Sequence, residues 1–270
     1  MTHSILLPRA IEFDLDVTTT ACLRPDVFEI TCRSFYNRLF RQFRSTRLIL
    51  NIDRMGEMTV SPEAMVEVAR PYFDVVHWRS PEHPGFGSAA QWCWQEVTSQ
   101  VFLHMEDDWL LARTVNADQA LKAFCQQPDL AALRLYLRRN PGPDYMAGDC
   151  LSLNPGFIRR DFIRAALPHF NVTKDAEKQF GQDPLLTALS DWNYRLYGEP
   201  KERAYVVDIG KKWRKSKGLE KWNPLGDEVT WHRDTRLTDA VQAWNRLKHR
   251  VTAAWWSWRA GKSPTPQQKF

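Results

Sequence analysis

Residues 101–109 read V-F-L-H-M-E-D-D-W, and the interpretation of the whole chain depends on this stretch. The apolar run at 101–105 has the length and the β-branched and aromatic content of one buried strand. Three carboxylates follow it directly, at Glu106, Asp107 and Asp108. Like charges this close together repel one another unless a cation or a set of hydrogen-bond donors neutralises them.

The position of this triplet favours a metal site. Open α/β sheets bind their ligands at the carboxyl ends of their strands. Mg²⁺ and Mn²⁺ take carboxylate oxygens as ligands and can bridge substrate phosphates. The alternative is a solvated acidic turn ahead of a helix that starts near Asn116.

Composition is that of an ordinary soluble globular protein. The 270 residues are 43% hydrophobic and 26% charged, which is enough to bury a sizeable core. No apolar run approaches the roughly 20 residues of a membrane span, and the first residues lack the charged start of a signal peptide. The five cysteines are widely spaced and fit neither a disulfide framework nor a zinc site. We therefore expect a cytoplasmic protein with free thiols.

Charge is unevenly distributed along the chain. Residues 195–262 contain 16 Lys and Arg against 8 Asp and Glu, and they contain seven of the twelve Trp. An acidic first part and a basic, Trp-rich last part indicate two roles on one chain. We expect a catalytic domain at 1–200 and a basic loop with a helical extension, packed on that domain, at 201–270.

The predicted elements alternate between strand and helix, which is typical of a parallel sheet covered by helices. Neither a dinucleotide-binding fingerprint nor a P-loop follows any strand, which argues against those enzymes. We expect strands at 11–20, 48–52, 73–78, 101–105, 130–137, 151–157 and 205–209. Helices are expected at 27–43, 62–70, 88–98, 116–127, 161–167, 185–190 and 237–258, with a turn at 18–24 and a basic loop at 210–219.

The last predicted helix is long and amphipathic, with apolar residues at helical spacing and a basic opposite face. Its Trp side chains could belong to the core, or they could lie on an anionic membrane surface. The apolar positions are Leu237, Val241, Trp244, Val251, Trp255 and Trp258.

Over about residues 12–191 the pattern resembles the GT-A class of nucleotide-sugar glycosyltransferases, most closely the inverting family 2 type. Glu106-Asp107-Asp108 resembles the D-x-D signature of that class, with Glu in the first place. Gly181-Gln182-Asp183 resembles its Glu-Asp pair at a helix start, with Gln in place of Glu. The resemblance implies a Rossmann-like α/β fold, a mostly parallel central sheet flanked by helices, here with the basic Trp-rich extension added.

The resemblance also implies roles for individual residues. Asp183 would be the general base, although it could instead be a simple helix cap, with Glu177 in reserve. A Mn²⁺ or Mg²⁺ ion would be held by Asp108 and Glu106, with His232 as a further ligand and Asp208 as a weaker candidate. Nucleotide-sugar contacts would come from Thr18, Thr20, Arg24, Asp53, Glu106 and Asp107, although Asp107 could bind backbone instead.

Three other polar positions have plainer readings. His104, inside a strand, is expected to be a core histidine, and Arg79 and His83 are expected in a solvated loop near the donor. Residues of the basic loop would contact the acceptor or phosphates, unless the loop is simply solvated. These residues are Lys211, Lys212, Trp213 and Arg214, and Arg138 and Arg139 could serve the same surface.

The acceptor is the least determined part of the prediction. Cations interleaved with Trp suit phosphate contacts and base stacking. We therefore favour a 5-hydroxymethyl-pyrimidine base in DNA, as modified by enzymes that viruses carry, which would place the protein in the host cytoplasm. The alternatives are a saccharide or lipid-linked acceptor with peripheral membrane contact, a nucleotidyltransferase, and a non-catalytic nucleic-acid-binding protein.

Overall fold

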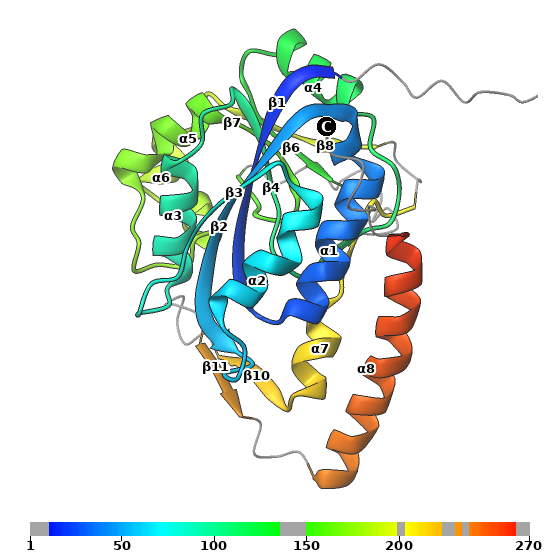
Figure 1. The fold of residues 1–270 in the computed structure, drawn as a ribbon. Helices are drawn as coiled ribbons and strands as arrows, with labels where there is room; N and C mark the ends of the chain where they lie inside the picture. Colours follow the sequence, from blue (N-terminus) through cyan, green and yellow to red (C-terminus); the bar gives the residue numbers. More distant parts are fainter. Residues whose placement is uncertain (1–10, 136–149, 199–202, 223–229, 234–237, 263–270) are drawn as a thin grey trace, which may run out of the picture.

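The computed structural model describes residues 11–135, 150–198, 203–222, 230–233 and 238–262, with backbone alone for 11–13, 221–222 and 230–233. Seven strands form one central sheet (Figure 1). Within it, β7 runs antiparallel to β4 and β6, and the other described pairs are parallel. The order is β3 (Val75–Arg79), β2 (Phe43–Gly56), β1 (Ile11–Leu23), β4 (Val101–His104), β7 (Gly156–Arg159), β6 (Leu130–Leu135) and β8 (Asn193–Tyr197).

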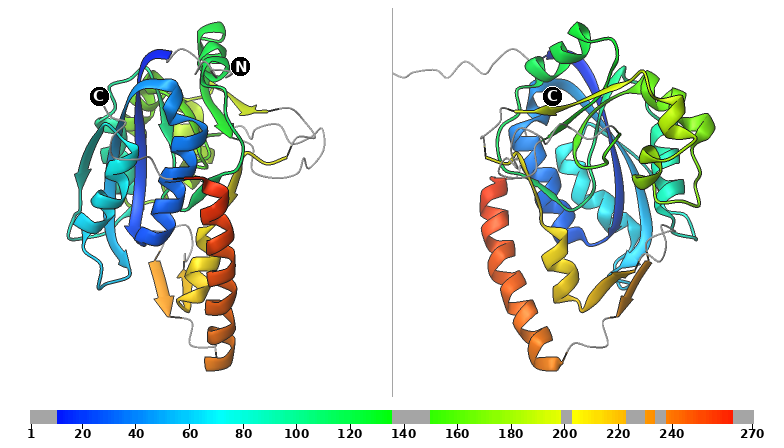
Figure 2. Two further views of the ribbon diagram at one scale, coloured as in Figure 1. Left: turned by 45° about the vertical axis from the view of Figure 1, so that its right-hand side comes forward. Right: turned by 180° about the vertical axis from the view of Figure 1, so that it is seen from behind.

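Helices cover both faces of this sheet, as the views from two further sides show (Figure 2). One face carries α1 (Pro25–Arg38), α2 (Pro62–Ala69) and α4 (Ala117–Gln126). The other carries α3 (Phe86–Gln95), α5 (Arg160–Ala166) and α6 (Leu185–Ala188). Short 3₁₀ turns lie at Phe40–Gln42, Arg70–Tyr72, Leu167–His169 and Lys178–Gly181.

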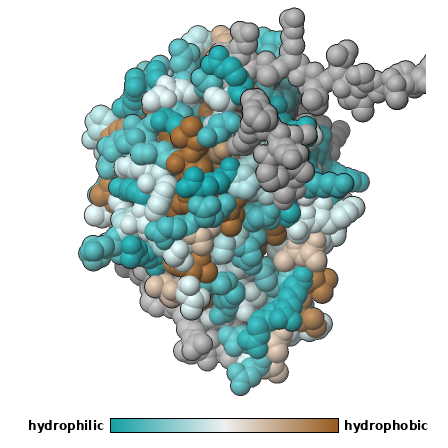
Figure 3. Space-filling view, viewed as in Figure 1, coloured by the Kyte–Doolittle hydropathy of each residue, from teal (hydrophilic) through white to brown (hydrophobic). Residues whose placement is uncertain are grey.

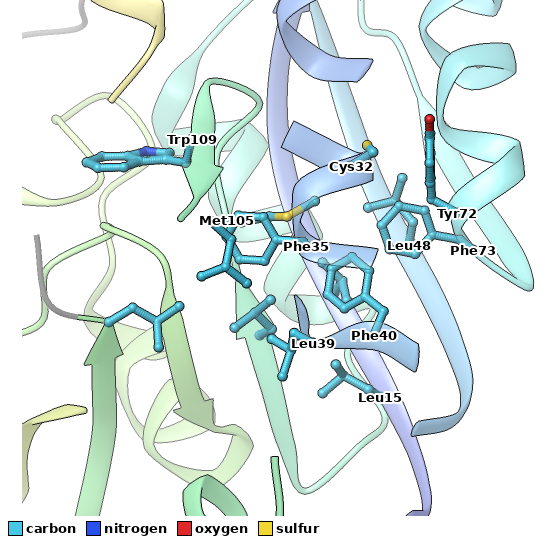
Figure 4. Close-up of a cluster of buried hydrophobic side chains, with 14 of the residues drawn as sticks. Leu15, Cys32, Phe35, Leu39, Phe40, Leu48, Tyr72, Phe73, Met105 and Trp109 are labelled. Atoms are coloured by element: carbon cyan, nitrogen blue, oxygen red, sulfur yellow. The ribbon is translucent and has the colours of Figure 1, made fainter. Parts of the chain in front are cut away.

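The larger core lies between α1 and the sheet. Figure 4 shows Phe35 of α1 and Leu39, which follows that helix, lying among Leu48, Phe40 and Met105. All of these side chains are at most 2% exposed, so the β1–β2–β4 centre is fixed by close packing. This packing makes the carboxyl ends of the parallel strands a rigid platform.

The first strand is longer than expected, and this corrects one prediction. Thr18, Thr19 and Thr20 lie inside β1 and pair with β2, in agreement with the strand expected at 11–20, so the turn expected at 18–24 begins too early. β-branched threonine suits a pleated strand, and this outweighed its frequent use in turns. The chain turns at Arg24 instead, and Pro25 opens α1 two residues before the expected start of that helix.

The basic segment after residue 209 is helical, so the prediction of a loop there is wrong. It forms α7 (Gly210–Ser216). The Asp208 carboxylate accepts a hydrogen bond from the Lys211 N–H at 3.1 Å, and Trp213 is fully buried below the helix. The cations therefore lie on the part of a packed helix that is turned away from Trp213.

The remaining elements lie at the C-terminal end. β9 (Val206–Asp208) pairs with β5 (Trp109–Leu111), and β10 (Leu219–Trp222) pairs with β11 (Thr230–Arg233). The long helix α8 (Asp239–Ala260) packs along α1 and α7, close to the predicted span. Among the described helices, none combines the length and apolar content needed to cross a membrane.

Candidate active site

The predicted site residues that follow β1, β2 and β4 meet at one edge of the sheet. Arg24 follows β1, Asp53 lies near the end of β2, and Asp107 and Asp108 follow β4. Because β1 lies between β2 and β4, the register brings Cys22 opposite Asp53. The triplet of the sequence is therefore at the carboxyl end of the parallel strands, where ligands of open α/β sheets bind.

Asp107 is enclosed by the β1–α1 turn. Arg24 donates from Nε to Asp107 Oδ2 at 2.6 Å and from its second terminal nitrogen to Oδ1, and the Cys22 N–H donates to Oδ2 at 3.0 Å. Burial raises the pKa of Asp107, and the Arg24 guanidinium opposes that rise. Both side chains are almost fully buried, so this pair stabilises the turn. This arrangement matches the alternative in which Asp107 binds protein groups.

Asp108 is more open than its neighbour and faces α7. One of its oxygens lies 3.0 Å from Arg24, while its main-chain oxygen accepts the Ile209 N–H at 2.9 Å. A Cβ atom at Gly210 would collide with the Asp108 carboxylate, so this close approach requires glycine. Nothing in the sequence except the glycine itself indicated this contact.

A second carboxylate, Asp208, lies beside Asp108. Burial raises the pKa of Asp208, and the negative charge of Asp108 raises it further. A carboxylate whose pKa is raised by a neighbouring carboxylate gains from a shared proton or cation. The strand pair β5–β9 thus brings Asp208, a minor candidate in the sequence, next to the predicted metal ligand.

The rest of the predicted metal set is less complete. Glu106 accepts a hydrogen bond from the indole N–H of Trp109 at 3.0 Å. His232 lies in β11 opposite Glu220, but its side chain is outside the described residues. Among the described side chains, no group of three His, Cys, Asp or Glu is arranged to hold a metal ion. Asp108 and Asp208 still fit Mg²⁺ or Mn²⁺, which can be held by one or two carboxylates together with substrate phosphates and water.

A polar chain continues along the edge from β2 to β3. Asn51 donates to Asp53 at 2.8 Å and accepts from Arg79 Nε at 2.7 Å. The Arg79 guanidinium also lies 4.7 Å from the centre of the Trp92 ring. Arg79 is thus the last residue of β3, held in place, whereas the sequence placed it in a solvated loop.

Two predicted nucleotide contacts lie inside β1. Thr18 is fully buried, and its hydroxyl is 2.9 Å from Nδ1 of His104 on β4. His104 is a core histidine, as expected, and burial lowers its pKa to about 4. Thr20, two residues further along β1, is 8% exposed. Thr18 therefore presents no surface to a nucleotide, because the sheet encloses it.

Asp183 lies just ahead of α6, as predicted. It is exposed, and its Oδ1 accepts a hydrogen bond from the Thr187 hydroxyl at 2.5 Å. Glu177, the reserve candidate, instead accepts from Ser152 at 2.5 Å and from the Leu153 N–H at 3.2 Å. Glu177 therefore holds the segment Ser152–Leu153, which precedes β7, against the 3₁₀ turn that follows Glu177. Asp183 is the more accessible of the two carboxylates.

The predicted acceptor contacts have different outcomes. Lys211 and Lys212 are exposed on α7, and Arg214 is half-buried near Asp208. Trp213 is fully buried in a cluster with Val27 and Trp256, so its prediction as a stacking residue is wrong. Its ring instead covers the Arg24 guanidinium, whose Cζ is 5.8 Å from the ring centre. Arg138 and Arg139 lie outside the described residues.

Comparison with known proteins now adds to this geometry. No protein-family model and no curated protein sequence matches the chain. A mannosyltransferase of Pyrobaculum calidifontis, solved with GDP-Man and Mn²⁺, is similar with a TM-score of 0.52 and 14% identity over 92% of this chain and 65% of that one. S. aureus TarS is similar with a TM-score of 0.51 and 10% identity over 76% of this chain and 39% of that one. TarS 1-349 with UDP-GlcNAc gives 0.50 and 11%, over 72% and 58%.

These likenesses show the fold. The expected class is confirmed: an α/β protein with a mostly parallel central sheet flanked by helices, as in these GT-A-like structures. The chain spans less than two thirds of the length of each of these three.

Proposed function

We propose that the chain is a metal-dependent inverting glycosyltransferase, which moves a sugar from a nucleotide-sugar, a UDP-sugar by preference, to an acceptor hydroxyl. The observation that carries the proposal is the Asp108–Asp208 pair at the ligand-binding edge of a GT-A-like sheet. Solved structures of this fold contain GDP-Man with Mn²⁺ or UDP-GlcNAc, which supports a nucleotide-sugar donor here.

Asp108 and Asp208 would hold the divalent cation. When bound, the cation supplies positive charge against the diphosphate leaving group as the glycosidic bond breaks. Oδ2 of Asp108 lies 3.0 Å from Arg24 and also faces Gly210 of α7, so Oδ1 would be the oxygen that binds the cation. The nucleotide would lie across β1 and β2, where Asp53 and Thr20 are the nearest candidates.

Asp183 would take the proton from the acceptor hydroxyl as that oxygen attacks the sugar carbon. Inversion requires one such base, and Asp183 is an exposed carboxylate ahead of a helix. The Thr187 hydroxyl fixes one carboxylate oxygen and leaves the second for the acceptor.

The decisive experiment measures donor hydrolysis and transfer with UDP-GlcNAc and GDP-Man, with Mn²⁺, with Mg²⁺ and with excess chelator. We expect Asp108→Asn to lower turnover about 100-fold or more, because stabilisation of the leaving-group charge is lost. Asp118→Asn is the matched control, because Asp118 is an exposed acid on α4 that pairs with Lys122. Full activity of Asp108→Asn, or in chelator, would refute the metal assignment.

A second measurement separates the base from the donor site. Asp183→Asn should abolish transfer while donor affinity, followed by calorimetry, stays within about twofold. An Asp183→Asn protein with normal transfer would remove Asp183 as the base.

The acceptor proposal remains the hydroxymethyl-pyrimidine base in DNA, supported by the exposed cations of α7. The loss of Trp213 as a stacking residue weakens this proposal relative to a saccharide. Incubation of hydroxymethyl-pyrimidine DNA and of an oligosaccharide panel with each donor, followed by mass spectrometry, distinguishes them. Transfer to oligosaccharides alone would overturn the DNA acceptor.

A further inference from the structure

The orientation of α8 is fixed by its contacts with α1. Arg38 and Asn37 donate to the Ala260 carbonyl at 3.1 and 2.9 Å, and Arg33 donates to the Ser257 hydroxyl at 2.6 Å. Trp256 and Ala260 pack into the cluster that contains Trp213. The face of α8 that turns inward is therefore narrow and is well anchored.

The opposite face of α8 is apolar and turned to solvent. Its side chains are between 45% and 75% exposed, and they recur every three or four residues along the helix. At 1.5 Å per residue, the 22 residues of α8 extend for about 33 Å. Hydrophobic side chains appear over α8 at the lower right of Figure 3, between hydrophilic ones. We call this the α8 stripe: Val241, Trp244, Leu247, Val251, Trp255 and Trp258.

Cations accompany the stripe. Lys248 lies 4.9 Å from the centre of the Trp244 ring, and the Arg259 guanidinium lies 5.5 Å from that of Trp255. Over its length α8 carries four Lys or Arg and one acidic residue, and the neighbouring residues 210–217 carry five cations and no acid. An anionic surface would complement this part of the molecule.

The composition of the stripe separates the possible occupants. Val, Leu and Trp side chains together suit the boundary between lipid headgroups and acyl chains, where Trp is enriched. A phosphate backbone offers no partner for the aliphatic members. Two copies of the stripe would bring cations of the same sign together, with Asp239 as the single acid to compensate.

We propose that the α8 stripe docks on an anionic lipid bilayer, with α8 lying in the plane of the interface. The rings and aliphatic side chains enter the headgroup region, and Lys248, beside Trp244, and Arg250 contact the lipid phosphates. This proposal does not depend on the transferase function, because no residue of the stripe belongs to the candidate active site.

The test is flotation of the full chain with phosphatidylcholine vesicles that contain or lack phosphatidylglycerol. We expect binding to the anionic vesicles and a blue shift of Trp fluorescence. The double variant Trp255→Gln/Trp258→Gln should bind about tenfold more weakly, because two apolar side chains no longer enter the interface. Lys248→Gln/Arg250→Gln should lose most of the preference for anionic lipid.

Met58→Gln/Leu186→Gln is the matched control, because both residues are exposed apolar side chains that do not belong to α8. It should bind like the wild type, and so should the inactive Asp108→Asn chain. Circular dichroism melts verify that each variant is folded. Absence of vesicle binding would overturn the proposal. The proposal would also be overturned if the stripe variant bound vesicles as the wild type does but had lost self-association, measured by sedimentation. The same holds if it bound vesicles normally but had lost DNA binding.

Discussion

The carboxyl edge of the sheet contains two regions, one around Asp107 and one around the next residue, Asp108. The first is enclosed by protein groups, whereas the second is more open. In the β1–β4 seam, Asp107 is closed in by Arg24 and Thr18 by His104. On the α7 rim, Asp108 is more open and has Asp208 beside it. Both carboxylates lie in the turn after β4 and contact Arg24, but only Asp108 faces Gly210 and has Asp208 beside it, so neighbouring residues of one motif have different surroundings.

The seam is where we expect the largest effect of a substitution. Asp107→Ala should lower the free energy of unfolding by about 3–5 kcal/mol, because a buried guanidinium loses its main partner. Denaturant unfolding measures this change. The matched control is Asp14→Ala, which breaks the exposed Arg44–Asp14 pair and should leave the midpoint unchanged.

The paired variant Arg24→Met/Asp107→Leu sharpens this test. It should recover part of the lost stability, because no buried charge is left without a partner. If Asp107→Ala is as stable as the wild type, the contact between Asp107 and Arg24 does not stabilise the fold.

His104 gives the seam a smaller, pH-dependent signature. Burial lowers its pKa from 6.5 to about 4, so the unfolded chain gains a proton before the folded chain does. Its contribution to stability is present above pH 6.5 and is lost as the pH falls towards 4, by on the order of 3 kcal/mol. Over that range the unfolding free energy of the wild type should therefore fall relative to that of His104→Leu.

An NMR titration of the His104 ring gives a second measurement. Its carbon signal should stay that of the neutral ring until about pH 4. Titration near pH 6.5 would show that the seam admits water.

The sequence predicted the triplet at a strand end because a buried strand and a charged turn are local properties. It did not separate Asp107 from Asp108, since that depends on Arg24 and Gly210, which lie about 80 and 100 residues away. The five cations at 211–217 suggested a loop, yet Trp213 and Asp208 stabilise a helix there.

Helix α8 shows a related limit. Its periodicity identified the apolar stripe, but it did not determine which face turns inward. Small residues decide that, because Ala253 and Ala260 let α8 approach α1 and α7 closely beside Trp256. The stripe of larger apolar side chains consequently stays outside.

The rim is tested by a substitution that adds one carbon atom. Gly210→Ala places a Cβ against the Asp108 carboxylate, so that carboxylate or the start of α7 must move. We expect a loss of about 1–3 kcal/mol in unfolding free energy, typical of an overpacked contact. Gly181→Ala is the control for stability, since the nearest atom to its new Cβ is Cys150 Sγ at 3.6 Å.

The two regions also predict different consequences for function: Gly210→Ala should weaken Mn²⁺-dependent turnover more than the folded fraction explains, whereas Asp107→Ala should lower turnover only in proportion to the folded fraction. Equal specific activity of folded Gly210→Ala and wild type would mean that the position of Asp108 on the rim does not matter to the reaction.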